Sequence, residues 1–266
     1  MTDTGKPPVT PDPLATEPGA EPKLPRNATS WATKVDRLQV EERAGVRGTN
    51  VSGRRLTSPI QGFGRMWQKT YTTNLSAAAT PQQVISTWKA HFPEFWPKGN
   101  RFAGALAGIS PGDVALLDLS MGGVKLSTGV FVLYADEESF TLMTPEGHMF
   151  AGWISFSAED GGDGTIAQAQ VLMRANDPLY EMGLTMGGHR KEDLFWSQTL
   201  TALAGRFGIE APVIETKSVC VDRRRQWRNA GNTWHNAMIR SMFQTAAHPF
   251  GGGRRASPGE NIPPHE

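Results

Sequence analysis

The sequence has little cysteine and no long apolar run. Its single cysteine, Cys220, has no partner for an internal disulfide. No apolar stretch is long enough to span a bilayer, and no positively charged start precedes an apolar run as in a signal peptide. These absences favour a cytoplasmic protein of bacterial type. The N-x-S/T matches at Asn27, Asn50 and Asn74 are then expected to carry no glycan.

The sequence also lacks a recognisable metal or nucleophile motif. Its six histidines are scattered, without cysteine partners or the spacing of metal ligands, so we expect neither a metal nor a cofactor. The segment Gly108–Gly112 matches G-x-S-x-G, but a nucleophile elbow needs a strand before it and a helix after it. Ser110-Pro111 is instead typical of a turn between two strands, and we assign no catalytic residue.

The two ends have few large apolar side chains. Seven of the first 25 residues are proline, and residues 248–266 are similarly rich in glycine and proline. Burial there cannot offset the entropy cost of ordering, so we expect disordered tails at residues 1–30 and 248–266. Residues 31–55 are expected to hold one short helix, around Lys34–Ala44, and a glycine-rich linker.

Charge divides the rest of the chain, although the net charge is only +1. Residues 56–216 contain ten Lys and Arg against sixteen Asp and Glu, a formal charge of −6. From Lys217 onward there are eight basic and three acidic residues, a formal charge of +5. We therefore expect a main domain at 56–208, a linker at 209–221 and a separate basic segment at 222–247.

The main domain reads as one strand, two short helices, six strands and a long helix. Residues 63–71 alternate as a strand does, and Thr80-Pro81 opens a helix that Pro93 ends before a second short turn. The six later strands are predicted at Arg101–Ile109, Asp113–Ser120, Val124–Tyr134, Ser139–Thr144, Met149–Ser157 and Thr165–Ala175. Asp177 caps a helical segment that breaks at Gly187-Gly188 and resumes as far as Gly208.

This order predicts an α+β fold in which a curled antiparallel sheet of about seven strands grips the long C-terminal helix. A sheet curled around one helix tends to leave a cavity. The pieces "TPQQVISTW", "FPEFWP" and "TPEGH" carry a resemblance to the helix-grip (SRPBCC) superfamily of START-like, polyketide-cyclase-like and birch-pollen-allergen-like domains. The stretch "FTLMTPEGHMFAGWISF" is similar to a bacterial branch of that superfamily.

The resemblance implies binding of a hydrophobic or amphipathic small molecule, lipid-like or polyketide-like, between the sheet and the long helix. An enzyme of the polyketide cyclase or dehydratase type, acting in the same cavity, is the alternative. Because the sequence reveals no nucleophile, metal set or clearly placed acid–base pair, binding is the preferred interpretation. Whether any reaction is catalysed stays open.

Several side chains are candidates for the site, each with an alternative role. If the shared face of Arg65, Lys69 and their aromatic neighbours points inward, its cations suit an anionic amphipathic ligand. His148, in the TPEGH turn, either touches the ligand or holds the hairpin. His189 forms either an acid–base pair with Glu192 or Asp193, one turn further on, or an ordinary helix start. The candidate ligand-binding residues are Arg65, Trp67, Lys69, Tyr71, Trp88, His148, Trp153, His189, Trp196 and Leu200.

The basic segment at 222–247 is predicted to be an amphipathic helix. Trp227, Trp234, Met238 and Met242 fall within about one third of a helical wheel. Arg224 and Arg228 flank this stripe, and the opposite face carries Asn229, Asn236, Arg225 and Arg240. Three interpretations stay open: the helix docks on the acidic domain, lies on an anionic membrane surface, or contacts nucleic acid. Nucleic acid is the least favoured, because no nucleic-acid-binding motif accompanies the charge.

Overall fold

The computed structural model describes residues 27–40, 46, 48–76, 79–104, 108–121 and 124–247. The predicted tails lie outside these residues, except for a short 3-10 turn (η1) at Ala28–Ser30. The strands are β1 (Met66–Asn74), β2 (Arg101–Ala103), β3 (Val114–Met121), β4 (Val124–Ala135), β5 (Ser139–Met143), β6 (Phe150–Asp160), β7 (Thr165–Ala175) and β8 (Glu215–Asp222). The helices are α1 (Pro81–His91), α2 (Pro178–Gly183), α3 (His189–Arg206) and α4 (Ala237–Ala247). Shorter helical turns are η2 (Gly48–Asn50), η3 (Pro59–Gln61), η5 (Phe92–Phe95), η6 (Leu184–Gly188) and η7 (Trp227–His235).

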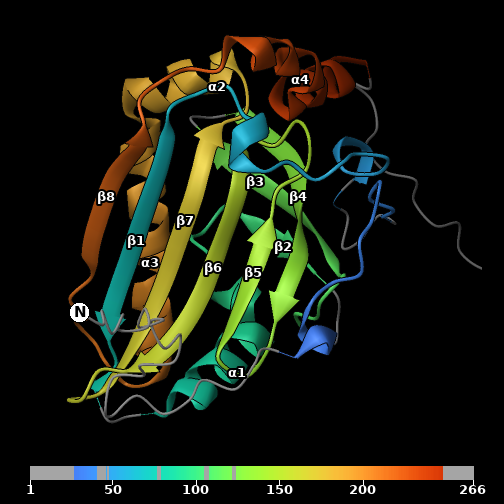
Figure 1. Cartoon of the computed structure of the whole chain (residues 1–266). Coiled ribbons are helices and arrows are strands. Elements are labelled where there is room, and N and C mark those ends of the chain that lie inside the picture. Colours follow the sequence, from blue (N-terminus) through green and yellow to red (C-terminus); the bar gives the residue numbers. More distant parts are fainter. Residues whose placement is uncertain are drawn as a thin grey trace, which may run out of the picture.

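The eight strands form one antiparallel sheet in the order β2-β3-β4-β5-β6-β7-β1-β8. The sheet curls, and α3 and α1 lie against the same face of it (Figure 1). The predicted α+β class is confirmed, with eight strands where about seven were expected.

Alternation along β7 separates the two faces of the sheet. The inner face is buried in the core, as predicted, and consists of Ala167, Ala169, Val171 and Met173. The residues that alternate with them are more accessible as far as Leu172, whereas Arg174 is buried. The adjacent strand β1 follows in register, with Lys69 opposite Val171. The inner face of β1 therefore carries Trp67, Lys69 and Tyr71.

Helix α1 begins with the predicted cap. The Thr80 hydroxyl accepts from the Gln83 backbone N–H at 3.3 Å, and the Gln83 side chain accepts from the Thr80 N–H at 2.9 Å. Its buried face ends in Trp88, and the turn η5 adds Phe92 and Phe95. Bulky rings after the helix thus fill one end of the core.

The helical segment before α3 is interrupted at the predicted position, Gly187-Gly188. Asp177 caps α2 by accepting from the backbone N–H groups of Leu179 and Tyr180. Helical geometry is lost at Met186 and at Gly187, whose φ is 109°, a conformation that favours glycine. Helix α3 then runs from His189 to Arg206.

The helix predicted around Lys34–Ala44 is wrong for the described part, which is extended or bent from residue 32 to 40. Leu38 is buried with Val46 and Val51 against the outer face of β3 and β4, near Phe131. The backbone of Leu38 also bonds to Gly53 and Arg54. Packing on the sheet decides the conformation here, rather than local helix propensity.

The linker predicted at 209–221 is also wrong in its second half, because Glu215–Asp222 forms β8. This edge strand pairs with β1, and most of its side chains are exposed. Without a buried face, it has none of the alternation that reveals a half-buried strand. The first strand likewise begins at Met66 rather than Phe63.

The segment 222–247 is not one continuous helix. It consists of an extended stretch, the 3-10 helix η7 and helix α4, and the two helices lie at the α2 end of the molecule (Figure 1). Asn229 donates to the backbone oxygens of Ile60 and Gly62, and Asn236 donates to Asp177 at 2.7 Å. The segment thus docks on the domain through asparagines of the face predicted to lie opposite the apolar stripe, and from the stripe itself Met238 packs against the buried cluster around Tyr180.

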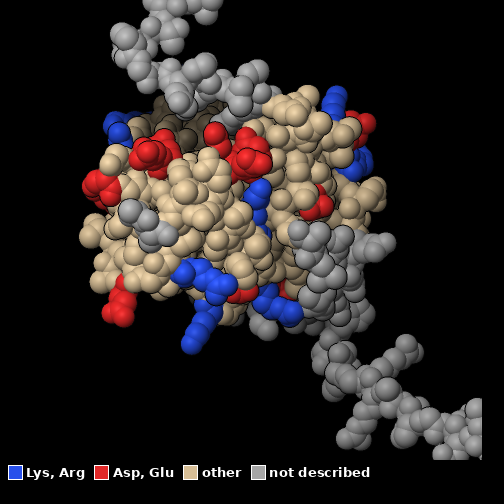
Figure 2. Space-filling model, turned by 90° about the horizontal axis from the view of Figure 1, so that it is seen from below, with Lys and Arg blue, Asp and Glu red and all other residues tan. Residues whose placement is uncertain are grey.

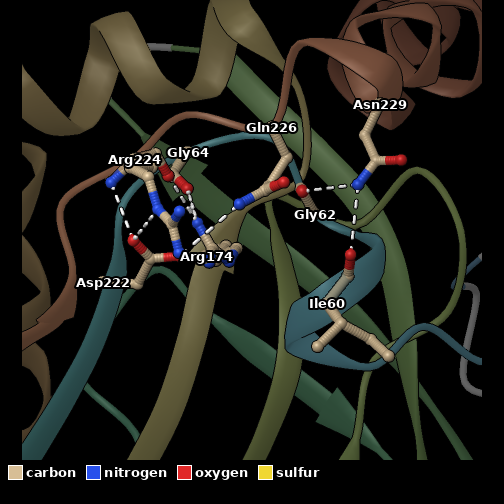
Figure 3. A network of polar contacts seen from close by, with 8 residues as sticks. All are labelled: Ile60, Gly62, Gly64, Arg174, Asp222, Arg224, Gln226 and Asn229. Carbon is tan, nitrogen blue, oxygen red and sulfur yellow. Dashed lines mark hydrogen bonds and ion pairs between the residues drawn. The ribbon is translucent and has the colours of Figure 1, made fainter.

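A buried arginine anchors the start of this segment (Figure 3). The Arg174 guanidinium lies 2.5 Å from a carboxylate oxygen of Asp222 and donates to the backbone oxygens of Gly64 and Arg224. Two hydrogen bonds lower the pKa of Asp222 to about 2. The larger effect comes from the Arg224 backbone N–H and the next from the Arg174 side chain. These contacts join β7, β8 and the chain before β1. Among the described helices, none is long and apolar enough to cross a membrane.

Candidate ligand-binding cavity

A cavity of about 430 Å³ lies between the inner face of the sheet and the N-terminal half of α3. Most of its walls are apolar side chains, with a few polar groups among them. The apolar walls include Trp96, Leu117, Leu119, Val130, Leu142, Met149, Phe150, Ile154, Val171, Met173, Leu184, Leu194, Phe195 and Trp196. The polar groups are Lys98, Asn100, Ser120, Thr144, His148, Lys191, Glu192 and Gln198.

The cavity sits where the aromatic cluster ends. Toward the C-terminal half of α3, the rings of Trp88, Phe92, Phe140 and Phe156 lie in contact and fill the space under the sheet. Trp96, just after η5, closes one wall by packing its ring against Phe195 of α3 at 5.1 Å. The segment "FPEFWP" that follows α1 therefore ends in the cavity wall, at Trp96 and Pro97.

An ion cluster that is buried at Lys69 and Glu192 and half-buried at Asp193 lies beside the cavity on α3 and β1. Lys69 Nζ is 2.7 Å from Asp193 Oδ1 and 2.9 Å from Glu192 Oε2, and it donates to the His189 carbonyl at 3.3 Å. Tyr71 donates to the same Asp193 oxygen, and burial followed by the charge of Glu192 raises the pKa of Tyr71. The two carboxylates leave Lys69 no uncompensated charge to offer a ligand, and the cluster as a whole is acidic.

Glu192 is the member of this cluster that also lines the cavity. Its side chain is 5% exposed, and neither carboxylate oxygen makes a hydrogen bond with a described residue. Lys69 is near enough for an ion pair, but not oriented for a hydrogen bond to it. Glu192 thus places a carboxyl group that is paired with Lys69, and whose oxygens are nearly inaccessible, at the wall of the cavity.

His148 lines the opposite wall, where the TPEGH turn enters β6. Its Nδ1 lies 3.0 Å from the Phe150 backbone nitrogen and 3.2 Å from the Phe150 backbone oxygen, and these two contacts require opposite tautomers. We assign the shorter contact, in which the amide N–H donates and Nδ1 accepts. The ring proton of neutral His148 is therefore on Nε2. Burial lowers the pKa of His148 to about 4, so the ring is neutral at pH 7. Both roles considered for His148 are open to it, because it holds the turn and also borders the cavity.

The structure brings three of the predicted ligand-binding residues to the cavity: His148, Trp153 and Trp196. Trp153 lies in β6 between Gly152 and Ile154, which face inward, so its side chain is on the outer face. We attribute its place in the wall to its main chain.

The other predicted residues lie elsewhere. Trp88 is fully buried in the aromatic cluster. Leu200 is fully buried on the face of α3 that packs against the core. Trp67 faces inward but packs against the ring of His189 at 4.8 Å, and Arg65 is exposed before β1 begins. Lys69 and Tyr71 belong to the ion cluster. None of these six side chains, nor His189, is among the residues that line the cavity.

No group of three or more metal-binding side chains occurs among the described residues. Comparison with protein-family models finds no match, and comparison with curated protein sequences finds none either. Solved structures do match. The two-domain aromatase/cyclase StfQ from the steffimycin biosynthetic pathway matches over 53% of this chain and 50% of its own, at 10% identity and a TM-score of 0.42.

Two smaller proteins match over nearly their full length. A START superfamily protein from Mycobacterium smegmatis is 23% identical, with 55% of this chain and 98% of that one covered and a TM-score of 0.37. Ara h 8.0201 is 13% identical, with 53% and 97% covered and a TM-score of 0.34. The topology, with one curled antiparallel sheet around α3, is that expected from the sequence resemblance. This is a helix-grip fold. The similarities are distant, and no ligand follows from them.

Within the helix-grip fold, sequence reasoning missed most of the cavity wall. The missed side chains are inner-face residues of β3 to β7, for example Leu117 and Val130, and residues of α3 such as Phe195. Alternation along each predicted strand was the available signal for the first group. Glu192 was noticed only as a possible partner of His189, and its position one turn from Trp196 on α3 was the signal for its inward direction.

Proposed function

We propose that this protein binds a hydrophobic or amphipathic small molecule in the cavity between the sheet and α3. The observation that carries the proposal is the cavity itself: about 430 Å³ with mainly apolar walls. Small-molecule sites are commonly concave, largely apolar and supplied with a few polar groups that orient the ligand. His148 and Glu192 are such groups here. Lipid-like and polyketide-like molecules both fit this description.

The test is binding of diphenylhexatriene, an apolar dye that fluoresces in dry surroundings, with a variant that blocks the cavity. Val130 lines the cavity from β4, and Val219 is 45% exposed on β8. Val130→Trp should abolish dye binding, whereas the matched control Val219→Trp should bind as the wild type does. Equal binding by both variants would place the dye elsewhere and contradict the proposal. Native mass spectrometry of protein from its own host should also show a co-purifying apolar molecule.

Cyclisation or dehydration in the same cavity is the enzymatic alternative. It has His148 and Glu192 available as groups that handle protons, but Glu192 lies in an ion pair with Lys69, and His148 is held neutral. Turnover of a polyketide intermediate that disappears in His148→Ala would favour the enzyme over the binder.

A second candidate function is contact with an anionic membrane surface. The observation that favours it is the exposure of two tryptophans on η7, Trp227 at 73% and Trp234 at 83%. Exposed arginines, including Arg223 and Arg228, lie in the same segment. Exposed aromatic rings rimmed by cations suit a headgroup interface. The opposite end of the molecule instead shows both charge signs scattered over a mostly uncharged surface (Figure 2).

Vesicle flotation separates this candidate from simple docking. The wild type should float with vesicles that contain phosphatidylserine and not with pure phosphatidylcholine, and Trp227→Ala with Trp234→Ala should abolish flotation. Because both side chains are largely exposed, the double variant should lose no more than about 1–2 kcal/mol of stability, mainly from the edge contact of Trp227 with Phe63. Unchanged flotation would remove membrane contact from consideration.

A further inference from the structure

His148 has one nitrogen occupied and one nitrogen unused. Its Nδ1 accepts from the Phe150 N–H, which leaves the proton on Nε2, and Nε2 bonds to no described residue. The residue is only 5% exposed, yet it lines the cavity. A side-chain N–H that borders a cavity and has no protein partner is available to donate to a molecule bound there. A ligand atom in the cavity is a natural partner for this one.

The turn that carries His148 is held firmly. Gly147 has a φ of 87°, and a side chain at this position would collide with the backbone oxygen of His235. The Ala237 N–H donates to the Gly147 oxygen at 2.9 Å. The docked C-terminal segment thus fixes the turn from outside, and the imidazole keeps one orientation toward the cavity.

The charges around the cavity select the kind of acceptor. His148 is neutral, and across the cavity Glu192 belongs to a cluster in which two carboxylates face one lysine. The two lysines of the cavity wall, Lys98 and Lys191, are exposed residues, whereas Glu192 is buried. A carboxylate ligand placed deep inside would therefore meet this acidic cluster and no buried cation of the wall. A neutral oxygen meets no such repulsion and can accept from Nε2.

We propose that His148 orients the ligand, and that its Nε2–H donates a hydrogen bond to a ketone or ester carbonyl on an otherwise apolar molecule. The inference rests on the proposed function, since it assigns the ligand class of the same cavity. It differs from the expectation drawn from Arg65 and Lys69, which favoured an anionic ligand.

The experiment uses a pair of ligands that differ in one group. Methyl heptyl ketone and nonane have similar length, and only the ketone offers an acceptor. Both are titrated against bound diphenylhexatriene, whose affinity is measured for each variant. The quantity compared is the ratio of the two dissociation constants, so that changes in cavity size cancel. Nonanoate serves as the anionic ligand of the same length.

The ratio should change only when His148 loses its donor. His148→Phe should reduce the preference for ketone about fivefold, the usual size of one neutral hydrogen bond. His148→Gln, which keeps an N–H donor, should retain part of it. The matched control His91→Phe alters a histidine at the end of α1, outside the cavity wall, and should leave the ratio unchanged. In the wild type, nonanoate should bind more weakly than the ketone.

Two results would overturn the inference: a ratio that is the same in His148→Phe as in the wild type, or nonanoate binding as tightly as the ketone. If instead neither ligand nor dye binds the wild type, the proposed function itself fails. NMR of the wild-type protein supplies a test that needs no variant. Ketone, but not nonane, should shift the His148 Nε2–H resonance, and the absence of that shift under saturation would contradict the proposal.

Discussion

The two halves of the inner face of the sheet differ in how the space beneath α3 is used. Under the C-terminal half of α3, Trp88, Phe92, Phe140 and Phe156 fill the space with rings in mutual contact. Under the N-terminal half, the same sheet and helix enclose a cavity. The helix pair after β1 reaches only one half. A single strand such as β7 therefore contributes side chains both to the close-packed core and, a few residues further along, to the cavity wall.

Folding stability and ligand binding therefore depend on side chains beneath different halves of α3. Side chains in the packed half contribute dispersion and hydrophobic free energy, while those in the hollow half have fewer partners. Substitutions of similar size should consequently have unequal effects in the two halves.

The largest effect is expected in the packed half. Phe156 is fully buried, stacked on Phe140 at 4.6 Å and packed edge-on against Trp88. Phe156→Ala should lower the free energy of unfolding by about 3–5 kcal/mol, because transfer and cavity costs add. Chemical denaturation measures it. A loss of less than about 1 kcal/mol would mean that the cluster is not closely packed.

A smaller effect, which depends on pH, is expected in the hollow half. The pKa of His148 falls from 6.5 to about 4 on folding because burial disfavours the charged ring. Between these values the unfolded chain binds a proton that the folded protein does not, so stability rises with pH. The contribution is complete above pH 6.5 and lost below about pH 4, on the order of 3 kcal/mol in all.

Comparison with His148→Gln isolates this contribution from the other titrating groups. Unfolding free energies measured from pH 4 to pH 7 should rise less steeply in the variant than in the wild type. If the two curves are parallel, His148 titrates normally and its side of the cavity is wet.

The parts of the fold that could be predicted from the sequence are those whose signals are local. The start of α1 is indicated by Thr80, Pro81 and Gln83. The alternation of apolar and polar residues predicted the bounds of β7 correctly. Gly187 and Asp177 marked the break and the cap before α3. These residues act within one turn or one strand, so the sequence displays their role.

The elements that were missed depend on partners far away in the chain. The edge strand β8 has little buried surface, and only its pairing with β1 defines it. In the C-terminal segment the apolar stripe suggested the docking face, but Trp227 and Trp234 of the stripe are exposed, and the asparagines donate to backbone oxygens and to Asp177. Likewise, the inward direction of Lys69 depends on Glu192 and Asp193, more than a hundred residues away.

The smallest effect is expected where the hollow half accepts extra volume. Ala169 and Val171 lie two residues apart on the inner face of β7; Ala169 is fully buried in the core, whereas Val171 borders the cavity. Ala169→Leu inserts methylenes into filled space and should cost about 1–3 kcal/mol through strain. Val171→Phe adds at least as many carbons, but the cavity can take them, so stability should change by less than about 1 kcal/mol and diphenylhexatriene binding should weaken. Thermal melts and dye titrations of both variants test the contrast on one strand. Equal destabilisation by the two substitutions would mean that the cavity near Val171 cannot admit a ring, and the division of the inner face into a packed and a hollow half would then have to be redrawn.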